Sequence, residues 1–394
     1  MPQDATPTHD HGRIIHEVLW SEALPWWLLF RAAGTAFAPT VILLALCGGL
    51  ATWAGWSIAD SLRLAGADPA ADAILDASFE PGPVIPGPDG SGVTLAPSRR
   101  ALPALRTAWN WLPKPAANVL ELVGIPFRPS ATLVQMGGAL ARLGWFVLVW
   151  SIFGTAITRH VALKLVGEEA PGLIGAVLYG ARKWLAAFNS VGFVLLGIVA
   201  LSTPGALLGL AMRTDWGLAA AGVVWPLVLA GAVVLAILAI GLVFGWPLMV
   251  AAVGVERGDS FQAISTSFSY LYQRPLHYAF YAAVALVVAL PAFAAAGLFA
   301  DATTTLALWA ASFGMGHDRT LAVLEGLRGS ADATWGMRAV GFWTRGLESL
   351  LGSFGWGYFW AIATAAYMLL RQDVDGTELD EVVLDEVVLD EPTA

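Results

Sequence analysis

The sequence contains little of what most catalytic and metal sites are built from. Among 394 residues there is a single cysteine, Cys47, which excludes an internal disulfide and any thiolate metal site. Because Cys47 lies inside the first apolar run, we expect it to act as a small buried hydrophobe. The sequence motifs of phosphate loops, dinucleotide sites, zinc proteases and serine hydrolases do not occur in a usable context. The residues therefore predict no enzymatic activity, no cofactor and no bound metal.

Charge is also scarce. Charged residues make up 13% of the chain and hydrophobic residues 57%, whereas a soluble domain usually carries roughly 25% charged residues. Several uncharged windows are long enough to cross a bilayer core of about 30 Å. The sequence therefore predicts an all-α fold: a polytopic transmembrane helical bundle with interfacial amphipathic helices.

The apolar runs predict a membrane domain over residues 35–372, after a cytosolic N-terminus with an interfacial helix over 1–34. Within it we expect about six spans, at 36–58, 139–158, 186–209, 221–248, 276–300 and 347–370. Residues 59–138 form a Pro/Gly-rich external loop. A helix at 303–314 is too short to cross alone and is placed at the interface or on the bundle.

The distribution of positive charge gives the expected orientation. Nine of the 21 basic residues, Arg31, Lys164 and Arg371 among them, fall in short segments that are cytosolic if the N-terminus is inside. An even number of spans returns the C-terminus to the same side. We therefore expect a multi-pass protein of the cytoplasmic (inner) membrane with both termini in the cytosol.

A weak internal repeat places one amphipathic helix after the second span and another after the fourth. The second copy reads ERGDSFQAISTSFSYLYQRPLHYAFY, and Asp259 followed by Gln262 fits a capping box at its start. An apolar stripe of Phe261, Ile264, Phe268 and Leu271 should face lipid or the bundle, with the hydroxyls toward headgroups or water. The helix should end before Pro275. Lipid-headgroup contacts are expected from Arg182, Lys183, Arg257 and Arg274.

The segment 373–394 carries nine acids and no base, and thus the whole formal charge of −9. Its charge predicts a flexible cytosolic tail. It repeats LDEVV, and Val–Val pairs between acids could add a strand to the sheet edge of a partner. Docking to a cytosolic protein is therefore expected from Leu379, Asp380, Glu381, Leu384, Asp385 and Glu386.

Several segments together resemble bacterial polytopic membrane proteins of unknown function. They are LPWWLLFRAAGTAFAP, FGTAITRHVALKLVGEE, DSFQAISTSFSYLYQRPLHY and YMLLRQDVDGTELDEV. Because they are spread from residue 24 to residue 382, the resemblance covers most of the chain. More distantly, the arrangement is similar to the membrane domain attached to some glycerophosphodiester phosphodiesterases, whose catalytic barrel this chain lacks. The resemblance implies a helical membrane fold and brings no activity.

These observations favour a non-enzymatic scaffold or envelope-organisation factor. The alternative is a permease or a lipid-handling membrane protein, suggested by the repeated unit. Membrane lipids and a cytosolic protein are the expected partners, and no nucleic acid is expected.

Overall fold

The computed structural model describes residues 24–62, 119, 122, 123, 125, 132–327 and 334–379, and these residues form helices joined by short turns. The first helices are η1 (Pro25–Trp27), α2 (Leu28–Thr35), α3 (Pro39–Ser61) and α7 (Leu133–Val166). They are followed by α8 (Leu173–Ala211), α9 (Asp215–Glu256), α10 (Ser260–Gln273) and α11 (Pro275–Met315). The last are α12 (His317–Leu327), α13 (Trp335–Gly352) and α14 (Phe354–Asp375).

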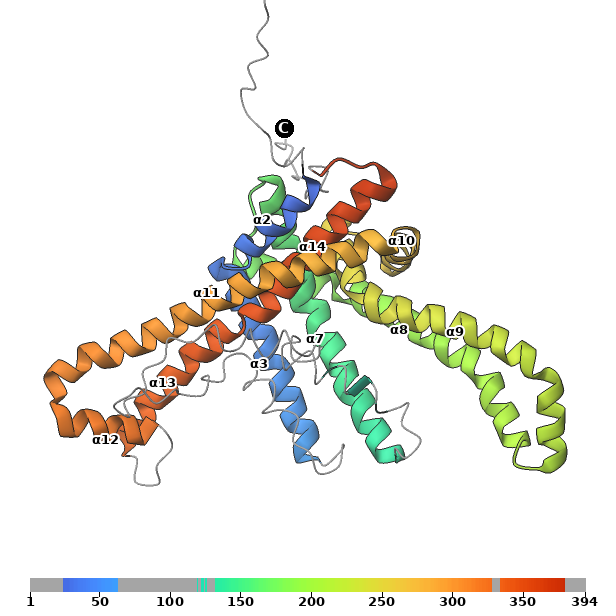
Figure 1. Ribbon diagram of the computed structural model, residues 1–394, viewed down its shortest axis with the longest axis horizontal. Coiled ribbons are helices and arrows are strands. Elements are labelled where there is room, and N and C mark those ends of the chain that lie inside the picture. The colour runs from blue at the N-terminus through green and yellow to red at the C-terminus, as the bar shows by residue number, and fades with distance from the viewer. Residues whose placement is uncertain are drawn as a thin grey trace, which may run out of the picture.

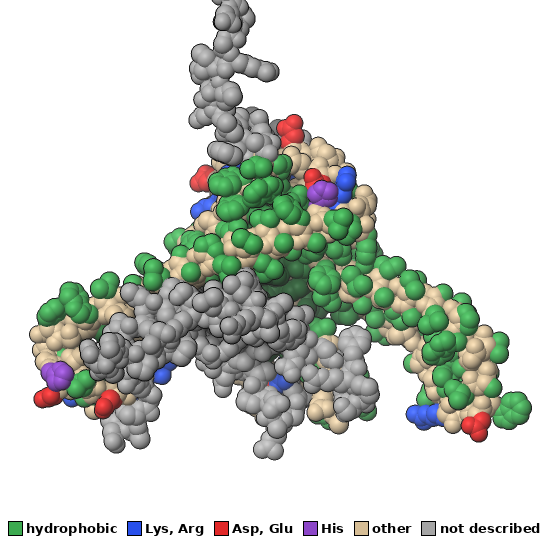
Figure 2. All heavy atoms as spheres, in the orientation of Figure 1, with side chains coloured by type: hydrophobic (Ala, Val, Ile, Leu, Met, Phe, Trp, Pro, Cys, Tyr) green, Lys and Arg blue, Asp and Glu red, His purple; other side chains and the backbone are tan. Residues whose placement is uncertain are grey.

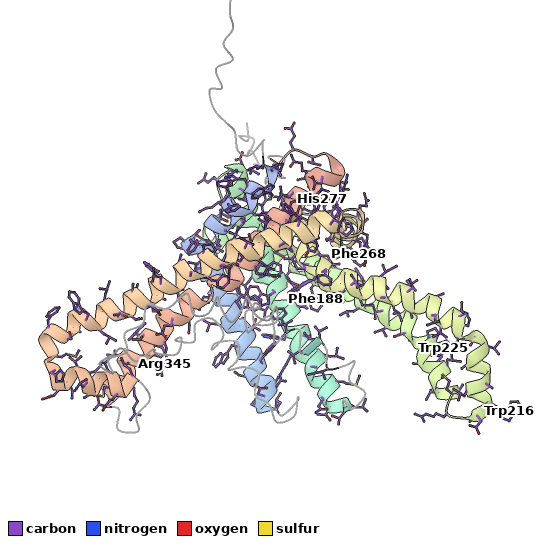
Figure 3. All side chains as sticks on the ribbon, in the orientation of Figure 1. Phe188, Trp216, Trp225, Phe268, His277 and Arg345 are labelled. Carbon is purple, nitrogen blue, oxygen red and sulfur yellow. The ribbon has the colours of Figure 1, made fainter. Side chains whose placement is uncertain are left out.

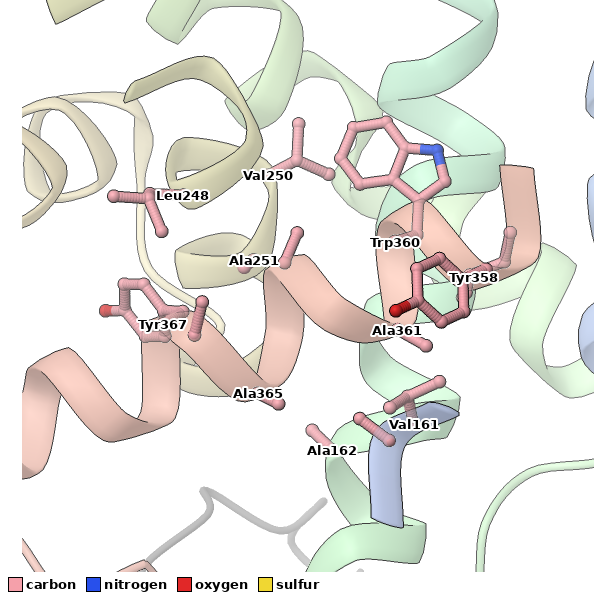
Figure 4. Close-up of a cluster of buried hydrophobic side chains, with 14 of the residues drawn as sticks. Val161, Ala162, Leu248, Val250, Ala251, Tyr358, Trp360, Ala361, Ala365 and Tyr367 are labelled. Atoms are coloured by element: carbon pink, nitrogen blue, oxygen red, sulfur yellow. The ribbon is translucent and has the colours of Figure 1, made fainter. Parts of the chain in front are cut away.

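The ends of three helices meet in a packed centre, which we call the hub. Every residue is buried in the segments 154–163 of α7, 248–255 of α9 and 363–370 of α14. A helix that is buried on all sides must be surrounded by other helices. Figure 4 shows Val161, Leu248 and Trp360 from these three helices in one cluster of buried side chains.

From the hub, helices extend in three directions (Figure 1). Helices α3 and α7 run down together, α8 and α9 form a hairpin to the right, and α11 runs to the left before α12 and α13 return. We call residues 195–240 the α8–α9 arm, and Ala221 is its only buried residue. The most apolar 18-residue window is 6% buried in α9 but 50% buried in α7. The arm therefore exposes its apolar side chains, and these are stable only in an apolar environment such as lipid.

Five helices are long and apolar enough to cross a membrane: α3, α7, α8, α9 and α11. Three of them, α8, α9 and α11, have 39, 42 and 41 residues. At 1.5 Å per residue each is about 60 Å long, roughly twice the thickness of a bilayer core. Such helices fit a bilayer only when they tilt or extend beyond it. On the face shown in Figure 2, charged side chains gather at the upper end and along the lower margin, and the arms between them are largely free of charge.

The helices are longer than the predicted spans because chain breaks expected from the sequence are absent. The first amphipathic segment joins its span without interruption, so α8 is continuous from Leu173 to Ala211. The predicted short helix 303–314 is the end of α11. Four helix-internal prolines, Pro204, Pro226, Pro247 and Pro291, do not end these helices. Neighbouring helices and local adjustments can satisfy the freed backbone groups.

The region of the predicted sixth span, 347–370, is divided between two helices at Ser353. Helix α14 is not among the five apolar helices, because Trp, Tyr and Gly replace aliphatic residues along much of it. It also continues beyond the predicted span, to Asp375, where Gly376 takes a left-handed conformation and ends the helix. The predicted tail, 373–394, therefore begins inside the fold. Cys47, predicted to be buried, is exposed on α3.

The close approach of α7 and α9 depends on Gly254. A Cβ atom at this position would stand 2.1 Å from Oγ1 of Thr158. The Thr158 hydroxyl donates to the Thr155 carbonyl oxygen at 3.0 Å, which holds it in place. We expect Gly254→Ala to destabilise the protein by about 1–3 kcal/mol, as overpacking does in well-packed cores.

Gly222 provides the matched control, because a Cβ there meets no atom within 4 Å. Alanine favours a helix over glycine by about 1 kcal/mol, so Gly222→Ala should leave stability unchanged or raise it. Thermal unfolding of the two purified variants in mild detergent measures the difference. Equal melting temperatures would contradict close packing at Gly254.

Candidate functional site

A group of eight polar side chains lies at the upper end of the hub, where α9, α10, α11 and α14 meet. We call it the polar latch, and it consists of Glu256, Gln262, Tyr270, Tyr281, Tyr367, Arg371, Asp373 and Asp375. Its residues come from the last turn of α9, from α10, from the first turns of α11 and from the end of α14.

Glu256 is the acceptor at the centre of the latch. Its Oε1 accepts the Tyr367 hydroxyl and lies 3.4 Å from Nε of Arg371. Its Oε2 accepts from Nε2 of Gln262 at 2.8 Å. The side chains of Glu256 and Arg371 are only 12% and 15% exposed. Hydrogen bonds to a charged group are stronger than neutral ones, and water competes little at such exposure.

Two further tyrosines hold the end of α14. The Tyr281 hydroxyl donates to Oδ2 of Asp373 at 2.8 Å, and the Tyr270 hydroxyl donates to Oδ2 of Asp375. Burial raises the pKa of the Tyr270 phenol, and the hydrogen bond to Asp375 raises it further. The Tyr270 hydroxyl therefore remains protonated, and a donor, at physiological pH.

The latch is part of a wider pattern. The sequence has seven tyrosines, and all lie in the described residues. Each hydroxyl donates to a different helix: Tyr179 to Val253, Tyr270 to Asp375, Tyr272 to Ile237, Tyr278 to Phe244, Tyr281 to Asp373, Tyr358 to Ala285 and Tyr367 to Glu256. Between apolar helices, these bonds fix the register and rotation of each helix against its neighbour.

The turn after α9 brings the latch residues together. Arg257 has φ 61° and is the only residue other than glycine with positive φ in the described residues. This left-handed residue ends α9 directly after Glu256. Asp259 then starts α10, because its Oδ1 accepts from the Gln262 backbone N–H at 2.8 Å. The predicted cap at Asp259 is confirmed, but the Gln262 side chain bonds to Glu256 and does not complete a capping box.

Helix α10 ends at Gln273, before Pro275, as predicted. The predicted apolar stripe divides between the two surroundings expected for it: Leu271 is buried, Ile264 and Phe268 pack against the hub, and Phe261 is exposed. Ser260, Ala263, Ser267, Tyr270 and Leu271 are buried, whereas Phe261 is 67% exposed and stacks on Phe193. The Phe268 ring fits against Gly241 of α9, where a Cβ atom would stand 2.4 Å from it. The side chains of Ser260 and Ser267, whose hydroxyls were expected to face headgroups or water, are buried.

A second group of buried polar side chains lies on α7. The Arg159 guanidinium is 1% exposed and lies 5.3 Å from the centre of the Tyr179 ring, a cation–π geometry. His160 is 3% exposed, and its Nδ1 lies 2.9 Å from the Pro171 carbonyl oxygen. Because a carbonyl oxygen only accepts, Nδ1 must carry the proton. Both side chains fasten α7 to the segment that begins α8.

Of the predicted headgroup contacts, the structure brings two together. Nζ of Lys183 donates to the Arg257 carbonyl oxygen at 2.7 Å, so the two copies of the weak repeat touch. Arg182 and Arg274 are exposed.

Of the predicted docking residues, Leu379 is half-buried and packs against the hub. Asp380, Glu381, Leu384, Asp385 and Glu386 lie outside the described residues. The latch itself was not predicted. Its signal in the sequence is that four of the seven tyrosines, Tyr270, Tyr272, Tyr278 and Tyr281, lie within 12 residues of each other. The sequence also missed the ion pair of Asp60 with Arg142, a residue that lies within the predicted span 139–158.

The described fold is that of an all-helical membrane-embedded protein, with five helices able to cross a bilayer. Comparison of the chain with protein-family models, with curated proteins and with solved structures found no match. The resemblance to bacterial polytopic membrane proteins therefore stays a prediction.

The Tyr367 hydroxyl can be removed without changing the shape of the side chain. We expect Tyr367→Phe to destabilise the protein by about 1–2 kcal/mol, because Glu256 loses a donor in a largely buried site. Tyr272→Phe is the control, since Tyr272 is 41% exposed and donates to a backbone carbonyl oxygen. Its cost should be nearer 0.6 kcal/mol, about the average for hydrogen bonds between membrane helices.

Thermal unfolding in detergent gives both values. Glu256→Gln combined with Tyr367→Phe should cost less than the sum of the two single changes, because they remove one shared bond. Additive effects would show that the two residues do not act together.

Proposed function

We propose that this chain is a non-enzymatic scaffold of the bacterial inner membrane, which holds its acidic C-terminal segment at a fixed place on the cytosolic face for a partner protein. The observation that carries the proposal is the latch at the end of α14. Asp373 and Asp375 are the first two acids after the apolar part of this helix, and both accept hydrogen bonds from tyrosines of other helices. The segment after Leu379 thus starts from a rigid point.

The arms support the same role. A docking platform must stay in the membrane while a partner pulls on it, and anchoring strength grows with the apolar area in contact with lipid. The α8–α9 arm exposes large aliphatic side chains along its length, for example Val223, Leu227 and Val233. Figure 3 shows Trp216 at its tip and Trp225 nearer the hub. Tryptophan at such a tip is typical of a membrane interface.

The proposed orientation places both termini in the cytosol. Helix α2, the first α-helix described, packs against α14, and both lie at the upper end of the molecule (Figure 1). Four basic residues gather around the ends of α7 and α9: Arg31 bonds to Leu165 beside Lys164, Lys183 bonds to Arg257, and Arg371 pairs with Glu256. An excess of basic residues marks the cytosolic side.

The alternative is a permease or lipid-handling protein. It is favoured by the contact between the two repeat copies, through Lys183 and Arg257, because paired repeats are common in transporters. Polar side chains within the α8–α9 arm offer little support, since the hydroxyls of Ser202 and Thr203 both donate to the Val199 carbonyl oxygen of their own helix. Lipid or small-solute flux above that of empty liposomes would favour the alternative over the scaffold.

Two truncations separate docking from folding. A chain ending at Leu379 keeps the latch and should unfold at the same temperature as the full chain, but lose its cytosolic partner. A chain ending at Gln372 also loses Asp373, Asp375 and the packing of Val374, and should melt several degrees lower. Thermal unfolding and quantitative co-purification after crosslinking measure the two effects. An unchanged set of co-purified proteins for the chain ending at Leu379 would reject the docking role.

Reporter fusions test the orientation. Fusions at Gly217, between α8 and the body of α9, should report the outside of the inner membrane. Fusions after Leu379 should report the cytosol, and this position leaves the latch intact. The same side for both reporters would contradict the proposed topology.

A further inference from the structure

A hollow on the surface of the upper end combines positive charge with apolar surface. It has a volume of about 490 Å³ and lies between α2, the turn that follows it and the end of α7. The side chains that matter here are Arg31 and Lys164, with Phe37 and Leu165 beside them. The lining contains no carboxylate.

The two cations differ in how they are held. Nη2 of Arg31 donates to the Leu165 carbonyl oxygen at 2.7 Å, which fixes the guanidinium at the edge of the hollow, and within the described residues its other N–H groups have no acceptor. Lys164 is exposed, and in the described residues neither it nor Arg31 forms an ion pair with a carboxylate. Glu168 and Glu169 follow on the exposed turn after α7 but do not line the hollow. An arginine fork beside a lysine is a recurrent way to bind phosphate.

The aromatic residues around the hollow are of the kind found at the depth of lipid headgroups. Helix α2 begins next to Trp27 and Phe30, which are 40% and 38% exposed and stack with ring centres 4.8 Å apart. Exposed aromatic pairs of this kind are typical of the membrane interface. Phe37 is 41% exposed at the hollow and begins the apolar surface that leads into α3. A ligand here meets positive charge and apolar surface together.

We propose that this hollow binds the phosphate of an anionic phospholipid, with Arg31 and Lys164 on the phosphate and Phe37 against the glycerol and first acyl carbons. The site differs from the four headgroup contacts predicted from the sequence, and it does not depend on the scaffold role. Lys164 and Arg31 also lie at the C-terminus of α7, where positive charge stabilises the helix dipole. The experiment must therefore separate this structural role from lipid binding.

The test uses the purified full chain in neutral detergent. Phosphatidylglycerol, phosphatidylcholine and free glycerol phosphate are added separately at equal concentrations. Lipid retained per protein is measured by native mass spectrometry, and thermal unfolding is measured in parallel, since a ligand that binds the folded state raises the melting temperature. We expect retention of phosphatidylglycerol well above phosphatidylcholine, with no stabilisation by glycerol phosphate. Equal stabilisation by glycerol phosphate would assign the hollow to a free phosphate and overturn the lipid proposal.

Lys164→Gln is the main variant, because Lys164 is exposed and its ammonium group forms no hydrogen bond within the described residues. Phosphatidylglycerol affinity should fall about fivefold, and about 30-fold when Arg31→Gln is added, as expected from roughly 1 kcal/mol per cation near an anionic surface. Without lipid, the melting temperature of Lys164→Gln should equal that of the parent. A lower melting temperature with unchanged lipid affinity would mean a structural role only, and would overturn the proposal.

The matched control is Arg182→Gln with Arg274→Gln. These two arginines are exposed and lie outside the hollow. Their substitution removes the same charge as Lys164→Gln with Arg31→Gln. Lipid affinity should stay unchanged in the control. An equal loss would show that the general positive field binds lipid, and a loss in the control alone would favour the contacts predicted from the sequence; either result would overturn the proposal for the hollow.

Discussion

The bond from the Tyr367 hydroxyl to Glu256 joins the ends of α14 and α9, and the arrangement of the hub depends on it. In the hub, the segments 248–255 of α9 and 363–370 of α14 are buried on all sides and have no polar surface with which to fix their relative rotation. Apolar packing alone tolerates many rotations of similar energy, whereas a buried carboxylate without a donor is costly. Glu256 thus accepts only the rotation of α14 that brings Tyr367 and Arg371 to it. The tyrosines of α10 and α11 then fix the same helix through Asp373 and Asp375.

The hub is held together by contacts between helices, whereas the arms are surrounded mainly by lipid. In the hub, glycine and alanine allow backbones to approach closely, and tyrosine hydroxyls add directional bonds between helices. In the α8–α9 arm almost no side chain is buried, so its two helices are held against each other weakly and depend on the surrounding solvent. A rigid centre with lipid-supported arms suits a protein that positions something at its centre better than one that opens a path through it.

Composition and long apolar runs were sufficient to predict the helical membrane fold, because a bilayer allows few alternatives to helices. The start of α10 at Asp259 and its end before Pro275 were also predicted, since capping and proline act locally. The helix lengths were not predicted. In the second copy of the repeat, Pro275 separates the amphipathic helix α10 from the span α11. The first copy has no proline at the matching place, so its amphipathic segment and its span form one helix, α8. Periodicity is similar in both copies and carries no information on that break.

The buried face of α10 shows why the site was harder to predict than the fold. Hydrophobicity ranks Phe261 as a core residue and Ser267 as a surface residue, yet the structure exposes the first and buries the second. In water the ranking holds, because burial is driven by transfer out of water. In a membrane, a phenylalanine facing lipid gives up nothing, and close approach between helices favours the smallest side chains. The same reversal explains the latch: Tyr270 and Tyr367 are buried, because a hydroxyl away from water is most stable when another helix accepts its hydrogen bond.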